Sequence, residues 1–63
     1  MSKYNSSNIK IGDKVYFERE GINNYNLYWT VLGFLDNMIE IEIDEMEYND
    51  KIYIDFSDIT QTS

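Results

Sequence analysis

Hydrophobic and polar residues alternate along several stretches of the chain, a pattern typical of β-strands that bury one face. The most regular stretch is "MIEIEID", residues 38–44, in which acids separate three isoleucines. Two shorter alternations and one mostly apolar run complete the set. The predicted strands cover residues 14–19, 27–35, 38–44 and 51–56, with the final residues as a fifth. Val15 and Phe17 are expected on the buried face of the first strand.

Residues 36–37, Asp-Asn, predict a two-residue hairpin turn between the second and third strands. This turn sets the pairs Leu35–Met38, Phe34–Ile39, Leu32–Ile41 and Thr30–Ile43. In this register the isoleucines face the core with Leu32 and Phe34. Glu40 and Glu42 must then face outward, because strand side chains alternate.

The next hairpin is less regular, and its turn is predicted near residues 48–50. Unbroken pairing around that turn would place glutamates opposite Ile52 and Ile54. We therefore expect a β-bulge near Asp44–Glu45, which would switch Met46 onto the core face.

Three segments outside the strands complete the expected organisation. The loop "EGINNYN", residues 20–26, holds three asparagines, which tolerate left-handed backbone and form side-chain turns. Near the C-terminus, Ser57 is expected to cap a short 3-10 turn, with Ile59 as the last core residue. Residues 1–8 are polar and predicted to be a flexible lead, so that residues 9–63 form a single domain.

Five strands, one long loop, two hairpins and a 3-10 turn predict an all-β, five-stranded SH3-like barrel, because closure removes exposed sheet edges. The segments that carry a family resemblance are "IKIGDKVYF", "YWTVLGFLDN" and "FSDI". They resemble the opening strand, the second strand and the 3-10 closure of small SH3-like barrels of the KOW and Tudor-like group. The resemblance covers residues 9–60 and implies an architecture, not an activity.

Composition excludes several kinds of chemistry. The chain has no cysteine and no histidine, so it offers no disulfide, thiolate nucleophile, imidazole base or His/Cys zinc site. The acids near residues 44–50 lack the spacing and central glycine of a calcium loop. We therefore expect no enzyme activity, no cofactor and no metal. Without an apolar leader or a long apolar span, the protein is expected to be soluble and cytoplasmic, with no membrane partner.

Charge is distributed unevenly along the chain, whose net charge is −7. Residues 1–35 hold four cations and three acids, whereas residues 36–63 hold nine acids and one lysine. This second half repels phosphate, so no direct nucleic-acid binding is expected.

The natural partner for such a chain is a protein with a basic surface, such as a nucleic-acid-binding enzyme. The acids expected to bind it are Glu40, Glu42, Asp44, Glu45, Glu47 and Asp50. Alternate residues of a strand lie about 6.6 to 6.8 Å apart, similar to successive phosphates of one DNA strand. The sharper form of this hypothesis is a phage or mobile-element inhibitor that mimics DNA. The plainer interpretation is a solvated strand face whose charges also protect an edge.

Two alternatives remain open from the sequence. An SH3- or Tudor-like groove could bind a peptide or a nucleic-acid base through exposed aromatic residues, above all Tyr28, Trp29 and Tyr53. Alternatively, the chain is a monomer or small homo-oligomer whose outer-face Val31, Leu35 and Met38 are covered by a second copy. The plainer interpretation of the aromatic residues is packing, since a chain this short needs its large side chains for a core.

Overall fold

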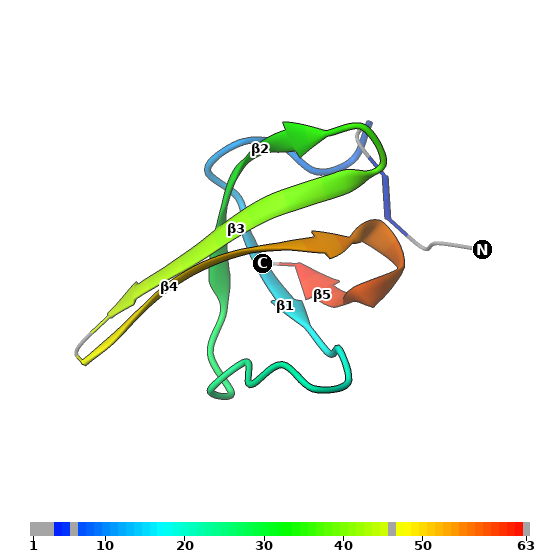
Figure 1. The fold of residues 1–63 in the computed structure, drawn as a ribbon. Helices are drawn as coiled ribbons and strands as arrows, with labels where there is room; N and C mark the ends of the chain where they lie inside the picture. Colours follow the sequence, from blue (N-terminus) through cyan, green and yellow to red (C-terminus); the bar gives the residue numbers. More distant parts are fainter. Residues whose placement is uncertain (1–3, 6, 46, 63) are drawn as a thin grey trace.

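The chain folds as an antiparallel β-sheet with one 3-10 turn, as the computed structural model shows for residues 4–5, 7–45 and 47–62 (Figure 1). Its elements are β1 (Lys14–Phe17), β2 (Trp29–Leu35), β3 (Met38–Glu45), β4 (Tyr48–Asp55), η1 (Phe56–Asp58) and β5 (Ile59–Thr62). The predicted all-β class, with five strands and a 3-10 turn near the C-terminus, is confirmed. No helix in these residues is long and apolar enough to cross a membrane.

The strands lie in the order β4-β3-β2-β1-β5. Strand β2 bends over the core, so that its start pairs with β1 and the rest of its length with β3 (Figure 1). Strands β4 and β5 form the two edges and are not paired with each other within the described ranges. The sheet is therefore strongly curved but is not closed by backbone pairing.

The core lies on the inner face of this curved sheet. Its buried side chains are aliphatic or aromatic: Ile9, Val15, Phe17, Trp29, Val31, Ile39, Ile41, Ile43, Ile54 and Ile59. This confirms the predicted burial of Val15, Phe17, Ile59 and the isoleucine row of β3. Tyr4, from the segment expected to be a flexible lead, packs against this core, while residues 1–3 and 6 of that segment lie outside the described residues.

The register of β2 differs from the prediction. The turn at residues 36–37 and the pairs Leu35–Met38 and Phe34–Ile39 are confirmed, but the pairing then shifts and Val31, not Leu32, faces Ile41. Val31 is buried, whereas Leu32 is half-buried and Phe34 is 39% exposed. The extra residue at the shift is a bulge, which switches the faces of the strand and carries the bulky Trp29 into the core.

The hairpin of β3 and β4 also differs from the prediction. Its strands pair without interruption from Met38–Asp55 to Glu45–Tyr48, so the bulge expected near Asp44–Glu45 is absent. The turn precedes Tyr48 instead of lying at residues 48–50, and this displacement sets isoleucine opposite isoleucine: Ile39 faces Ile54, and Ile41 faces Ile52. A bulge is unnecessary because this register already matches the apolar faces. The predicted core position of Met46 lies outside the described residues.

The C-terminal turn is capped differently from the expected arrangement. Its N-cap is Asp55, not Ser57, and the Asp58 carboxylate accepts a hydrogen bond of 3.1 Å from the Asp55 backbone N–H. Arg19 donates to the same carboxylate at 3.2 Å. Asp58 thus joins the 3-10 turn to the start of the first loop.

Candidate functional site

The outer face of the β3–β4 hairpin carries a line of carboxylates on β3. Glu40, Glu42 and Asp44 alternate with the buried isoleucines of β3, and their side chains are half-buried or exposed. We call these three residues the acidic row. Their positions follow from the burial of the isoleucines, because neighbouring side chains of a strand point to opposite faces.

The neighbours of the acidic row are mostly neutral. On β4, Tyr53 faces Glu40, Lys51 faces Glu42 and Asn49 faces Asp44. Arg19 makes both of the ion pairs found among the described residues, with Asp58 at 3.2 Å and with Asp55 at 4.0 Å. The acidic row therefore has no ion pair in this part of the chain, although like charges along a strand repel one another.

The other predicted acids do not join this row. Glu45 and Asp50 lie on the inner face of the hairpin, where Glu45 pairs with Tyr48 and Asp50 pairs with Ile43. Glu47 is in the turn. The six acids expected to act together are thus divided between two faces, and only Glu40, Glu42 and Asp44 form a continuous line.

Asp50 has a structural partner that the sequence did not predict. The hydroxyl of Tyr25, in the first loop, donates a hydrogen bond of 2.6 Å to the Asp50 carboxylate. The Tyr25 ring stacks on Tyr48 at a centroid distance of 4.3 Å and lies parallel to Trp29 at 6.1 Å. The hydrogen bond to Asp50 is the main cause that raises the pKa of Tyr25 above its ordinary value, with desolvation and the Asp50 charge adding to it. This contact ties the first loop to the inner face of the hairpin.

The asparagines of "INNYN" hold the loop in the shape that this contact requires. Tyr25 and Asn26 both have a left-handed backbone, with φ of 57°. Their backbone N–H groups donate to the side-chain oxygens of Asn23 at 2.7 Å and Asn24 at 2.9 Å. These are the side-chain turns that favour asparagine in such loops. The asparagine cluster indicates an ordered loop, but it does not identify Asp50 as the partner of Tyr25.

The predicted aromatic groove is not formed around Trp29. Trp29 is only 1% exposed and packs edge-on against Phe17 at 5.3 Å. Its Nε1–H donates to the Asn24 carbonyl at 3.0 Å. The expected exposure of Trp29 is therefore wrong, because this chain uses its largest side chain in the core.

The two tyrosines expected beside Trp29 lie apart from each other. Tyr28 is half-buried and donates its hydroxyl to the Gln61 side chain at 2.8 Å. Tyr53 is 44% exposed on the outer face, opposite Glu40. Of the three aromatic residues predicted to bind a partner, Tyr53 alone is exposed beside the acidic row.

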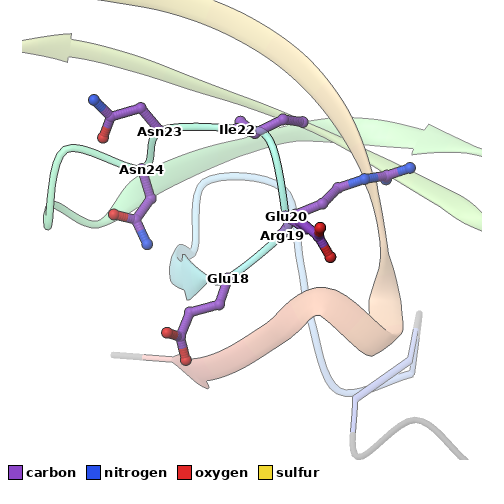
Figure 2. Close-up of a pocket in the computed structure, with 6 residues that line it drawn as sticks. All are labelled: Glu18, Arg19, Glu20, Ile22, Asn23 and Asn24. Atoms are coloured by element: carbon purple, nitrogen blue, oxygen red, sulfur yellow. The ribbon is translucent and has the colours of Figure 1, made fainter.

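A shallow depression of about 380 Å³ lies in the first loop, away from the acidic row. Its lining residues are Glu18, Arg19, Glu20, Ile22, Asn23 and Asn24 (Figure 2). Arg19 extends from the loop away from the other lining residues (Figure 2). Its guanidinium group lies 3.2 Å from the Asp58 carboxylate of the 3-10 turn. The rim of this depression carries charges of both signs. Its lining residues include no nucleophile with a neighbouring base, so they form no catalytic arrangement. No group of three acids in the described ranges could hold a metal ion.

Comparison with known proteins finds no matching family model, no matching curated protein and no matching solved structure.

Proposed function

We propose that this chain is a small, non-enzymatic interaction protein that docks on a basic surface of a protein partner. The acidic row supplies the electrostatic attraction, and Tyr53 supplies an aromatic contact at its end. The observation that carries the proposal is the line of Glu40, Glu42 and Asp44, none of which has an ion-pair partner among the described residues.

Electrostatic reasoning supports a cationic partner. A strand face that carries only negative charges destabilises the monomer, because like charges on a strand repel one another. A basic surface would relieve that repulsion and raise the rate of association. Tyr53 would add the affinity that charge alone does not provide, since aromatic anchors dominate the energetics of most interfaces.

We also propose that the architecture is an SH3-like barrel. The strand order β4-β3-β2-β1-β5, the long loop after β1 and the 3-10 turn before β5 support it. The curved sheet presents the acidic row on its outside. This geometry favours docking of a broad surface over capture of a peptide in a groove, because Trp29 is in the core.

The test compares charge reversals on the two faces of one hairpin. Glu40→Lys with Glu42→Lys reverses the outer face, and Glu45→Lys with Glu47→Lys changes the net charge by the same amount away from the acidic row. Immobilised wild-type protein and both variants are exposed to extract of the source cells. The retained proteins are then identified, and the binding of each one to each purified variant is measured separately.

We expect a basic partner that binds the wild-type protein and the Glu45/Glu47 variant but not the Glu40/Glu42 variant. Binding should weaken steeply toward 1 M salt, where the Debye length falls to about 3 Å. Equal loss in both double variants would mean that net charge alone attracts the partner. Unchanged binding by the Glu40/Glu42 variant would remove the acidic row from the interface and overturn the proposal.

In its sharper form, the proposal makes the partner a nucleic-acid-binding enzyme, with the acidic row in place of phosphates. Duplex DNA should then compete with the wild-type protein for the purified partner. A partner that binds DNA and this chain together would exclude the mimic while leaving the docking proposal intact.

A further inference from the structure

The outer face of the β3–β4 hairpin is apolar at the end where the acidic row begins. Met38 precedes Glu40 on the same face of β3, and Leu35 of β2 pairs with Met38. Tyr53 of β4 pairs with Glu40. Leu35 is 54% exposed and Tyr53 is 44% exposed, while Met38, on the strand between them, is half-buried. We call Leu35, Met38 and Tyr53 the apolar end of this face.

The face is accessible on both sides of the acidic row. On the β2 side, Gly33 pairs with Glu40, and a Cβ added to Gly33 would meet no atom within 4 Å. On the β4 side, Lys51 faces Glu42, but its exposed side chain makes no ion pair in the described part of the chain. The apolar end and the acidic row therefore form one continuous surface that a partner can reach.

This surface has a regular spacing along β3, which spans the length of the hairpin (Figure 1). Its positions on that strand are Met38, Glu40, Glu42 and Asp44. Alternate residues of a strand lie about 6.6 to 6.8 Å apart. One turn of an α-helix, from residue i to i+4, advances about 6 Å along the helix axis. A helix aligned with β3 therefore brings the side chains of one helix face over successive positions of this surface.

An extended segment matches the same spacing but fits the surface less well. The backbone N–H and C=O groups of a sheet point toward neighbouring strands, so a strand laid over the face finds no backbone partner there. The edge of β4 offers no alternative at the apolar end, because Ile54 is buried and the Asp55 N–H already donates to Asp58. A helix needs no such partner, because its backbone bonds to itself.

We infer that this surface binds an amphipathic, basic α-helix of the partner protein. Lys or Arg residues at i, i+4 and i+8 of that helix lie along the acidic row, and an apolar residue at i−3 packs on the apolar end. The inference rests on the proposed function, since it specifies which element of the partner meets the acidic row. A second copy of this chain is the less favourable occupant, because a net charge of −7 on each copy opposes their association.

Designed peptides test the inference without the natural partner. The first is an alanine-based helix of about 20 residues, long enough to be helical in water. It has lysines at i, i+4 and i+8 and a leucine three positions beyond them at each end, so that either direction of binding is served. The second peptide has the same composition, but its lysines are distributed around the helix. The third has proline in place of a central alanine, which breaks the helix and keeps the charge.

We expect the first peptide to bind at least tenfold more tightly than the other two, as measured by isothermal titration calorimetry. Circular dichroism verifies that the first two peptides are helical and the third is not. Glu40→Gln with Glu42→Gln should weaken binding of the first peptide about tenfold, because it removes two charges of the acidic row. Glu45→Gln with Glu47→Gln makes the same change in net charge away from the row and should have a much smaller effect.

Leu35→Ala tests the apolar end separately. This variant should weaken binding of the first peptide several-fold, but it should not affect a peptide in which alanine replaces both leucines. Ile11→Ala is the matched control, since Ile11 is 67% exposed and lies outside the β3–β4 hairpin. Circular dichroism of each protein variant verifies the fold.

Equal binding of the three peptides overturns the inference, and so does the absence of binding at millimolar peptide. Binding of the first peptide that the Glu40/Glu42 variant leaves intact overturns it as well. A free chain that forms a dimer which Leu35→Ala abolishes would show that a second copy covers this surface instead. The proposed function fails by a different result, when no captured partner depends on the acidic row. A partner that needs the acidic row while every helical peptide fails would exclude the helix and leave the proposed function intact.

Discussion

The Tyr25 hydroxyl lies 2.6 Å from the Asp50 carboxylate, although the two residues are 25 positions apart in the chain. Through this contact the first loop supports the β3–β4 hairpin at the level of Ile43, the last buried isoleucine of β3. The same hairpin bears the acidic row on its other face. The contact therefore stiffens the strand pair whose outer face we propose as the docking surface.

Removing this hydroxyl should destabilise the protein without changing its fold. Tyr25→Phe keeps the ring that stacks on Tyr48 but loses the donor to Asp50. We expect the free energy of unfolding to fall, because the folded state loses a hydrogen bond to a charged group. Urea denaturation measures the difference. Tyr28→Phe is the matched control outside the β3–β4 hairpin, where the hydroxyl bonds to the neutral Gln61.

Alkaline pH should abolish the difference between Tyr25→Phe and the wild-type protein. The pKa of Tyr25 is raised in the folded state from its ordinary 10.0, chiefly by the hydrogen bond to Asp50. A raised pKa means that the folded state holds this proton more tightly than the unfolded state. The stabilisation is then complete below the unfolded pKa and is lost as pH rises through the folded pKa.

Urea denaturation of both proteins at a series of pH values checks this expectation. The gap in unfolding free energy should be constant at neutral pH and should close above about pH 10. A gap that stays constant through the titration of the phenols would show that Tyr25 does not bond to an anion.

Alternation made β3 and its acidic row predictable from the sequence. Isoleucines at 39, 41 and 43 between acids allow one orientation only, because the opposite one would bury carboxylates. The sequence of strand β2 does not indicate which face is buried, since residues 27–35 are mostly apolar on both faces. Either face could have been the buried one. The burial of Trp29 goes with a bulge beside Gly33, a residue type that often marks bulges inside strands but does not fix which face is buried.

The turn of the last hairpin and the contact of Tyr25 were less accessible to sequence reasoning. The segment "DEMEYND" has several turn-forming residues and no glycine, so the turn could be placed at more than one position. Pairing isoleucine with isoleucine across β3 and β4 would have selected the observed turn. The Tyr25–Asp50 contact depends on loop geometry and on the course of the hairpin together, neither of which is encoded by a local pattern.

The observed register of β2 predicts an unusual order of stability effects for two neighbouring residues. Val31→Ala removes buried methyl groups and should cost about 2 kcal/mol of unfolding free energy. Leu32→Ala removes a larger but half-buried side chain and should cost less than about 1 kcal/mol. Thermal and urea denaturation of both variants measure the order. The reverse order would support the uninterrupted register, in which Leu32 faces Ile41.

Fluorescence of Trp29 should report a core residue and not a binding residue. The chain has one tryptophan, so its emission comes from a single indole, which is 1% exposed and packed against Phe17. We expect blue-shifted emission in the native protein and weak quenching by iodide, with both properties changing together on unfolding. The anionic quencher is itself repelled by this acidic chain, so neutral acrylamide at matched concentrations serves as the control. Native quenching by acrylamide as strong as in urea would place the indole in solvent and restore the aromatic groove as a binding site.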